Sequence, residues 1–551
     1  MKMTVIPLAV LVCIAAITPA QAQRTMGLMM HDTARSYQGY TFFAPLPYNV
    51  TYLIDNEGRL VQSWEAERVP AHAAYFQEDG LLLRTANMEN PIFTPGGSGG
   101  RVEHIDWDGS VVWQFDYSDS WVCLHHDIEP MPNGNVLMIA WESKLRDEVL
   151  ENGRDTAYID SMLWPDHVIE VHPDNDSIVW EWHIWDHLIQ DFDSTKLNYG
   201  VVSEHPELVD FNVVPRRDPR QPDWNHTNAI HYNPELDQIV LSPRPFHEFW
   251  VIDHSTTTEE AAGHTGGRYG KGGDLLYRWG NPQNYGRGGP PQRRLIGQHD
   301  PAWIADSLPG AGNILIFNNG NPNQRPWSTV DEIAPPMDSA GFYHLGQDSA
   351  YGPAWPLWQF IDTTWFFSQN ISGCQRLPNG NTLICSGADG TLFEVTPDSE
   401  VVWLYINPVT DTGPMIQGES IPPGANPVFK AYRYSPDFAG FVGRNLEPGN
   451  PIERYPGGIT APKVRTSRAT LSCPGVVRSG TPVFAAVSGG HTRLAVYDCM
   501  GREVAKLVDE VLPAGRHDLH WSTRNLASGS YFLKLTLGTA TSTRPVVVTR
   551  W

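Results

Sequence analysis

Residues 125–141 read HHDIEPMPNGNVLMIAW, and this stretch decides the fold. Two apolar runs flank Pro-Asn-Gly-Asn, a combination that is typical of a tight β-hairpin turn. The same plan of strand, turn and strand recurs in residues 71–86, 226–244, 298–320 and 374–387. The sequence therefore predicts five β-hairpins distributed along the chain.

A second repeat alternates with these hairpins. It consists of a turn signal, β-branched residues and a tryptophan, as in DWDGSVVW at residues 106–113. Repeats spaced about 45 to 100 residues apart, each able to form a small antiparallel sheet, indicate a β-propeller. The six copies predict an all-β protein with a six-bladed β-propeller, and their tryptophans are Trp64, Trp113, Trp180 with Trp182, Trp279, Trp358 and Trp403.

Six tryptophan strands but only five hairpins imply that one blade is composite. We expect its outer strands to come from residues near 40–66 and its remaining strands from residues near 428–445, which would close the ring. A count of seven blades would contradict this interpretation.

Composition and charge exclude several classes of protein. The 551 residues include 45 Pro, 49 Gly and 20 Trp, which excludes coiled coils, helical arrays and disordered chains. The net charge is −23, from 39 basic and 62 acidic residues, so general binding to nucleic acid or to an anionic membrane is disfavoured by repulsion.

The two ends of the chain indicate export and a second domain. Residues 1–22 combine Lys2, a short apolar run and an Ala-Gln-Ala motif, which predicts a signal peptide and a periplasmic, cell-surface or secreted protein. No other stretch is apolar enough for a transmembrane helix. We expect the propeller in residues 23–450, a linker in 451–467 and a small Ig-like β-sandwich in 468–551.

Two cysteines flank one of the hairpin turns. A two-residue turn at Asn379-Gly380 would place Cys374 opposite Cys385, and export makes a disulfide feasible there. A reduced, buried pair is an equally good interpretation. Because no CxxC spacing occurs, thiol-based zinc or redox chemistry is not indicated.

Three histidines share one position in the repeat. His126, His226 and His299 each stand at the start of a hairpin element, and His72 is a looser fourth equivalent. Equivalent positions of a propeller converge at one mouth of its central channel, so we expect these side chains to gather. They could bind a metal, act as nucleophiles or simply line a wet channel. Arg244, at the far end of the hairpin that begins with His226, favours an oxyanion over a dication.

Three blocks together resemble the bacterial arylsulfate sulfotransferases. They are HHDIEPMPNGN, DWNHTNAIHYNPELDQIVLSPR and GQHDPAW with GNILIFNNGN, and the resemblance covers roughly residues 45–450. It implies a six-bladed propeller that transfers a sulfuryl group from an aryl sulfate to a phenol. It further implies a transiently sulfurylated histidine, with no metal, no cofactor and no nucleotide sulfate donor.

The resemblance also assigns roles to particular residues. It makes His299 the nucleophile, with His126 as a supporting acid or base. It places His226, Asn228 and Arg244 as groups that stabilise the charge on the sulfuryl oxygens, in keeping with preorganised donors at developing charge. By proximity in sequence, Trp121, Trp224 and Phe246 are candidates for gripping aryl rings, although packing in the core is the better interpretation of each.

Other interpretations of the sequence stay open. The C-terminal string LAVYDCMGREVAKLVDEVL, in residues 494–512, resembles FlgD-like or secretion-associated domains, which implies sorting through a secretion machinery or attachment to the cell surface. An inert accessory sandwich is equally compatible with it. For the propeller, the alternatives to a sulfotransferase are a non-catalytic surface-binding module and a metal-dependent hydrolase that uses the same histidines.

Overall fold

The computed structural model divides the chain into two compact units, with the division between residues 456 and 457. The predicted signal peptide (1–22) and linker residues 457–467 lie outside the described residues. In the described part of the chain, no helix is long and apolar enough to cross a membrane. The structure describes residues 24–213, 220–346, 349–456, 469–472, 476–477, 481–487, 490–498, 502–513, 515–523, 526–537 and 540–548.

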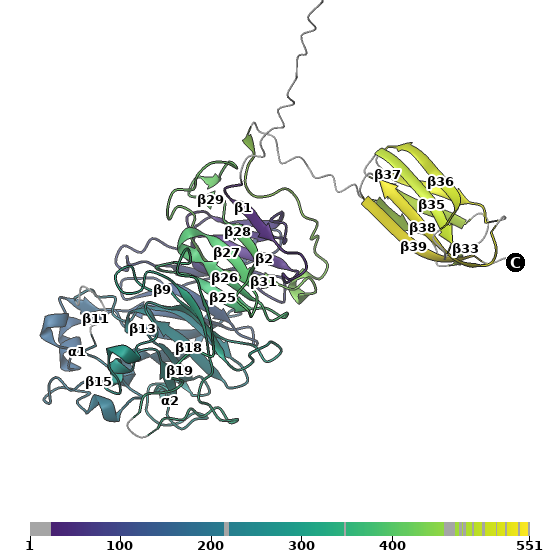
Figure 1. Cartoon of the computed structure of the whole chain (residues 1–551). Helices are drawn as coiled ribbons and strands as arrows, with labels where there is room; N and C mark the ends of the chain where they lie inside the picture. Colours follow the sequence, from purple (N-terminus) through teal and green to yellow (C-terminus); the bar gives the residue numbers. More distant parts are fainter. Residues whose placement is uncertain are drawn as a thin grey trace, which may run out of the picture. The chain divides into compact units, whose positions relative to one another are not determined.

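Six antiparallel sheets of four or five strands make up most of the first unit, and the protein is all-β in character (Figure 1). Among the described residues, three two-stranded ladders accompany them: β11 (Lys144–Leu145) with β12 (Met162–Leu163), β15 (Leu188–Ile189) with β16 (Val209–Asp210), and β29 (Val409–Thr410) with β30 (Gly413–Pro414). Short hairpins and 3₁₀ turns connect the strands, and the α-helices are brief: α1 (Arg146–Glu151) and α2 (Thr258–Ala261). The sheets, with their strands in spatial order, are β5 (Pro70–Phe76), β6 (Leu82–Asn87), β7 (Gly100–Ile105), β8 (Val111–Asp116); β9 (Val122–Pro130), β10 (Val136–Glu142), β13 (Asp166–His172), β14 (Ser177–His183); β17 (Thr227–Asn233), β18 (Gln238–Pro243), β19 (Phe249–Asp253), β20 (Tyr277–Trp279); β21 (His299–Trp303), β22 (Ile314–Asn318), β23 (Thr329–Ile333), β24 (Trp358–Ile361); β25 (Gly373–Arg376), β26 (Thr382–Ser386), β27 (Thr391–Val395), β28 (Val401–Ile406), β1 (Gly27–His31); and β31 (Val428–Tyr434), β2 (Tyr40–Pro45), β3 (Val50–Ile54), β4 (Leu60–Glu65).

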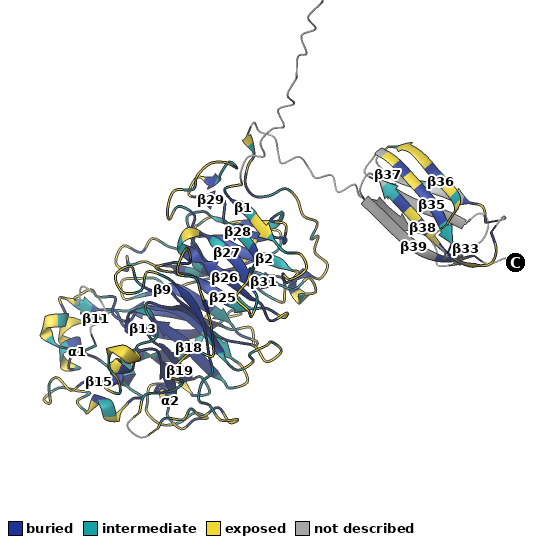
Figure 2. Cartoon of the chain, viewed as in Figure 1, coloured by how far each residue is buried: buried dark blue, intermediate teal, exposed yellow. Residues whose placement is uncertain are grey.

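The first strands of these sheets contact one another in a cycle. The order is β5, β9, β17, β21, β25 and β31, and β31 contacts β5 again. All five predicted hairpins are present as the first two strands of a sheet. These inner strands and their partners, such as β13, β18 and β26, form the buried part of the unit (Figure 2).

The composite sheet is confirmed by the strand pairing. Strand β2 pairs with β31, so that Phe42 lies opposite Tyr432, and β3 and β4 complete the sheet. The N-terminal and C-terminal parts of the unit are therefore joined in one hydrogen-bonded ladder. Strand β1, which the repeat pattern did not predict, adds a fifth strand to the sheet that ends in β28.

The repeated tryptophans link neighbouring sheets. Each predicted tryptophan strand is the fourth strand of its sheet, and its indole Nε1–H donates a hydrogen bond to the connection between the third and fourth strands of the next sheet. Since Trp403 donates to Asn56 near the N-terminus, these bonds also run in a closed cycle. The pairs are Trp64 with Asp106 O, Trp113 with Asp176 Oδ1, Trp180 with Thr256 Oγ1, Trp279 with Pro353 O, Trp358 with Pro397 O and Trp403 with Asn56 O.

The second unit contains two sheets among its described residues. One is three-stranded and the other five-stranded, and the apolar residues Leu494, Val496, Trp521 and Leu533 are buried in its core. Its strands are β32 (Ala469–Ser472), β34 (Thr481–Val487) and β37 (Gly515–Trp521) in one sheet, and β33 (Val476–Val477), β39 (Ala540–Val548), β38 (Gly529–Leu537), β35 (Gly490–Asp498) and β36 (Glu503–Leu512) in the other.

The expected pairing of Cys374 with Cys385 is wrong. Cys374 lies opposite Ile384, and Cys385 lies opposite Gly373, because the turn is one residue longer than predicted. A shift of one residue moves a side chain to the other face of a sheet. Both cysteines are free and buried, and each belongs to a different apolar cluster.

Candidate functional site

The repeat-equivalent histidines do gather where the first strands of the sheets begin. His126 lies in β9, His299 opens β21, and His226 immediately precedes β17. The ring centroid of His126 is 4.4 Å from that of His226 and 5.2 Å from that of His72. The Phe429 ring, in β31, lies 6.5 Å from both His126 and His299, so the cluster draws on five different sheets.

An irregular backbone orients the histidine side chains of the cluster. In β5, β9, β17 and β21 the strand pairing shifts close to the histidine, as in a β-bulge. His126 and His226 have φ of 53° and 43°, and Asp300 has φ of 55°, all in the left-handed region. A Cβ on Gly97 would lie 2.1 Å from the His126 ring, so a glycine is needed for this close approach.

His299 is buried, and its hydrogen bonds define its tautomer. Its Nδ1 lies 2.7 Å from Asn319 Oδ1, and the Asn319 amide donates to Ser368 O and Ile371 O. The Asn319 oxygen therefore faces the ring, and Nδ1 carries the hydrogen. The lone pair is on Nε2, which accepts a hydrogen bond from Ile371 N–H at 3.1 Å. Burial, followed by the charge of Arg244, holds the pKa of His299 well below its usual range.

His226 is paired with a carboxylate. Its Nδ1 is 2.7 Å from Asp223 Oδ2, while Asp223 Oδ1 accepts a hydrogen bond from Trp141 Nε1 at 3.1 Å. A carboxylate in this position orients the ring and stabilises the imidazolium form. His226 is therefore the histidine of the cluster best suited to take up and return a proton, a role that the sequence resemblance assigned to His126.

His126 lies against a second histidine. Its Nδ1 is 2.8 Å from Nδ1 of His125, which stacks on Trp141 and places Nε2 3.2 Å from Asp166 Oδ1. Burial, followed by the neighbouring His226, holds the pKa of His126 well below its usual range. His126 is thus a neutral imidazole in this arrangement.

Arg244 and Asn228 lie beside the strand that carries His299. Arg244 Nη2 donates to Gln369 O at 3.1 Å, and its guanidinium packs against Gly297, two residues before His299. The fully buried Asn228 uses an amide hydrogen to reach Gln298 O at 2.9 Å. Asn228 therefore supports the backbone that leads into His299.

The aspartates that follow His126 and His299 in sequence do not orient those rings. Asp127 Oδ2 lies 2.6 Å, and Asp300 Oδ1 2.7 Å, from the buried Lys430 Nζ. Tyr75 OH donates to Asp127 Oδ1 at 2.7 Å. Although burial acts against its charge, the two carboxylates raise the pKa of Lys430 well above its usual range. This network ties together strands of four sheets.

Several residues of the cluster were not predicted from the sequence. Asn319, Asp223, Lys430 and Phe429 occupy no repeat position that the histidines share, so nothing in the spacing marked them. His125 precedes His126 in the predicted block and could have been included. Of the aromatic candidates, Trp224 and Phe246 pack against each other in the core with centroids 5.4 Å apart, whereas Trp121 is exposed.

One known family matches part of the chain. Residues 32–268 match the arylsulfotransferase (ASST) family. The match supports activity as an arylsulfotransferase, which is a kind of transferase. It fits an aryl sulfate as the donor and a phenol as the acceptor. The matched segment includes His126, His226, Asn228 and Arg244, whereas His299 lies beyond it. No curated protein matches the chain.

Solved structures resemble the chain only distantly. A protein of unknown function from Bacteroides caccae is 11% identical, with 72% of this chain and 99% of that chain covered and a TM-score of 0.37. Virginiamycin B lyase from Staphylococcus aureus is 9% identical, with 70% and 85% covered and a TM-score of 0.31. Hydrazine synthase from Kuenenia stuttgartiensis is 12% identical, with 53% and 67% covered and a TM-score of 0.30.

Proposed function

We propose that this protein transfers a sulfuryl group from an aryl sulfate to a phenol through a sulfohistidine at His299. The observation that carries the proposal is the buried, neutral His299 ring, whose Nδ1–H is held by Asn319 so that the lone pair is on Nε2. A nucleophilic imidazole needs this tautomer. The nearby Arg244 is a fixed cation for sulfuryl oxygens, because a guanidinium matches the geometry of an oxyanion.

In the first half-reaction, His299 Nε2 attacks the sulfur of the donor. An N–S bond forms, the bond between sulfur and the aryl oxygen breaks, and the leaving phenolate takes a proton from the His226 imidazolium. A phenol has a pKa near 10, so this proton matters for the leaving group. Nε2 must first give up its hydrogen bond from Ile371 N–H, whose residue is held at φ 49°.

In the second half-reaction, the acceptor phenol gives its proton to neutral His226. Its oxygen then attacks the sulfur, the N–S bond breaks, and His299 returns to its starting state. Asp223 holds His226 in both protonation states. The scheme is ping-pong, because the first phenol leaves before the second reacts. It uses no nucleotide sulfate and needs no cofactor.

The architecture of the two units and the export of the protein are also part of this proposal. We infer that the six sheets form a six-bladed β-propeller within residues 23–450, supported by the cyclic contacts of their first strands and the cycle of tryptophan hydrogen bonds. We also infer an Ig-like sandwich in residues 468–551 that serves sorting or surface attachment, and export directed by residues 1–22.

The decisive experiment uses a chromogenic aryl sulfate with and without an added phenol. We expect release of the aryl group that depends on the phenol, and a protein mass increased by one sulfuryl group when the acceptor is omitted. Release that ignores the phenol would indicate a hydrolase. No release from a panel of donors would favour a binding module.

His299→Ala is the test variant, and His205→Ala is the control because it makes the same substitution at another histidine. His299→Ala should lower turnover by about 10⁴-fold or more and abolish the mass increase, because the nucleophile is gone. His205 is an exposed histidine that contacts Glu207, so its variant should behave like the wild type. A sulfurylated His299→Ala protein would remove His299 from the nucleophile role.

A further inference from the structure

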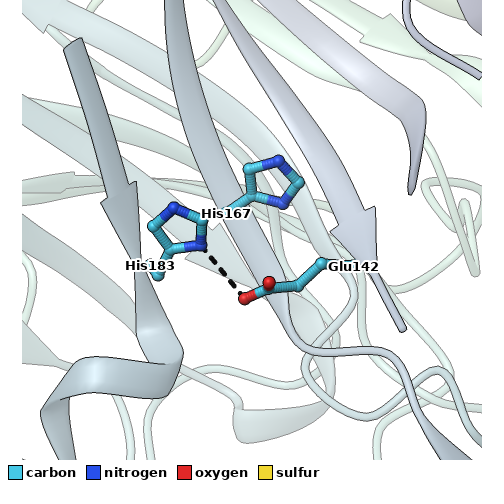
Figure 3. A group of neighbouring side chains, drawn as sticks. All are labelled: Glu142, His167 and His183. Carbon is cyan, nitrogen blue, oxygen red and sulfur yellow. Dashed lines mark hydrogen bonds and ion pairs between the residues drawn. The ribbon is translucent and has the colours of Figure 1, made fainter. Parts of the chain in front are cut away.

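A second group of histidines lies at one end of the sheet that contains β9, β10, β13 and β14. His167 in β13 and His183 in β14 are directly opposite each other, and their rings stack with centroids 4.9 Å apart. Glu142, the last residue of β10, lies beside them, and its carboxylate faces the two imidazoles (Figure 3). One ligand atom from each residue lies within 4.8 Å of those of the other two.

The two imidazoles present their Nδ1 atoms to Glu142. His183 Nδ1 is 3.1 Å from Glu142 Oε1. His167 Nδ1 is buried and has no hydrogen-bond partner among the described residues, and the residue as a whole is 1% exposed. An unpaired polar atom in such a position costs free energy unless something binds it.

The far nitrogens of both rings are held by other residues. His183 Nε2 lies 3.2 Å from Glu181 Oε2, and His167 Nε2 lies 3.3 Å from the Tyr117 hydroxyl. Histidines that bind metals characteristically donate their other N–H to a carboxylate or another oxygen, which fixes the ring and its tautomer. Both rings therefore carry the outer hydrogen bonds that a metal site requires.

We propose that Glu142, His167 and His183 bind a divalent transition-metal ion, with zinc as the ion of first choice. Two imidazole nitrogens and one carboxylate oxygen suit zinc and leave a coordination position for water. The side chains of His183 and Glu142 are 26% and 13% exposed, so solvent reaches the site. This site is separate from the sulfuryl-transfer centre and does not depend on the proposed function.

Zinc binding would displace one proton, and nearby charges would affect its affinity. The hydrogen on His183 Nδ1, shared with Glu142 in the metal-free protein, must leave to solvent as zinc takes its place. Lys144 Nζ lies 3.0 Å from the other oxygen of Glu142, and its positive charge opposes the metal. Glu181 adds negative charge on the opposite side of His183 and favours it.

A rival group consists of His187, His264 and Asp274. There His187 Nε2 is 2.8 Å from Ala261 O, and both His187 Nδ1 and His264 Nδ1 are 2.8 Å from one oxygen of Asp274. Each of these contacts is an ordinary hydrogen bond of an imidazole, with no vacant nitrogen pointing inward. The rival group thus serves as an internal control.

The test uses the full-length protein, stripped of metal with a chelator and titrated with zinc chloride by calorimetry. Metal content after gel filtration is measured by mass spectrometry. We expect one zinc per chain, and visible absorption bands when cobalt(II) replaces zinc. Glu181→Gln should weaken zinc binding by about 10- to 100-fold, as is typical when an outer partner of a ligand is lost. Lys144→Met should tighten it.

Variants of the proposed ligands test which residues bind the zinc. His167→Asn should lose the retained zinc and the cobalt bands, whereas His264→Asn should keep both. If His167→Asn does not fold, Glu142→Gln, which alters a partly exposed side chain, takes its place. Zinc that binds equally tightly to the wild type and to these variants overturns the proposal, as does a loss that follows His264→Asn instead.

Discussion

His72, His126 and His299 near the first strands, and His183 and His254 farther out, are held in opposite electrostatic surroundings. Burial, followed by the charge of His226, lowers the pKa of the central His72 to about 3. At the periphery, His254 bonds to Asp237 and Glu170 at 2.7 and 2.9 Å, and these carboxylates outweigh burial and raise its pKa to about 9. His183, between Glu142 and Glu181, is raised likewise to about 9.

The difference teaches that burial lowers the pKa of all five rings and that hydrogen-bonded carboxylates outweigh it at His183 and His254. Around His126 and His299, neighbouring histidines and Arg244 add to burial in disfavouring a proton, whereas the nearby His226 is paired with Asp223. Asp127 and Asp300 also lie close to the centre, but both bind Lys430. Lys430 thus holds these two carboxylates away from the rings of His126 and His299.

The largest expected effect follows from removing this lysine. Lys430→Met leaves two carboxylates buried without their cation, and we expect the free energy of unfolding to fall by about 3–5 kcal/mol. Urea unfolding measures it. Lys196→Met, which removes a surface pair with Glu151, is the control and should change little. A Lys430→Met protein as stable as this control would contradict the role of the network.

The next effect concerns the cation beside His299. Arg244→Gln should lower kcat/KM for an aryl sulfate by about 10²- to 10³-fold, because a preorganised donor to the transferring group is lost. Arg244→Lys keeps the charge without the planar fork and should fall between the wild type and Arg244→Gln. Equal activity of all three proteins would exclude Arg244 from the reaction.

A single substitution could turn the central His299 into a histidine of the peripheral kind. Asn319→Asp places a carboxylate against Nδ1, which should raise the pKa of His299 and populate the protonated, non-nucleophilic ring. We expect turnover near pH 7 to fall by about 10- to 100-fold and to recover as the pH rises. The measurement is the pH profile of kcat/KM. Asn323→Asp, on an exposed loop, should leave the profile unchanged.

The most gradual effect is a dependence of stability on pH that comes from His254. Its pKa in the folded protein, about 9, is above the unfolded value near 6.5, so its contribution is full below pH 6.5 and is lost as the pH rises through 9. The wild type should lose roughly 2–3 kcal/mol more than His254→Gln across this range. Urea midpoints at several pH values test this, and parallel curves would contradict it.

Much of the fold could be predicted because it is encoded locally. Turns such as Met131 to Asn135 close over a glycine with positive φ, and the apolar runs beside them alternate as strands do. The tryptophans marked one strand in each of the six large sheets, and β2 pairs with β31 within the segments near 40–66 and 428–445 that were predicted to share a sheet. The turn between Cys374 and Cys385 was mispredicted by one residue, since hairpin register depends on backbone geometry that the letters Asn-Gly do not specify.

Only some residues of the candidate site could be predicted from the sequence. His126, His226 and His299 could be found because they share a repeat position, and repeat positions converge in space. Asn319, Asp223 and Lys430 reach the cluster from other positions through side-chain hydrogen bonds, which no spacing encodes. Likewise, Asp127 and Asp300 follow histidines in sequence but turn away from them to Lys430.

The sequence by itself determined most of the strands and turns, the sheet built from both ends of the first unit and the histidines that would meet. Tertiary structure alone decided which of those histidines is neutral, which nitrogen carries its lone pair and which carboxylates are neutralised. The physical reason is that strand formation depends on neighbours along the chain, whereas protonation depends on charges and burial contributed by five or six different sheets.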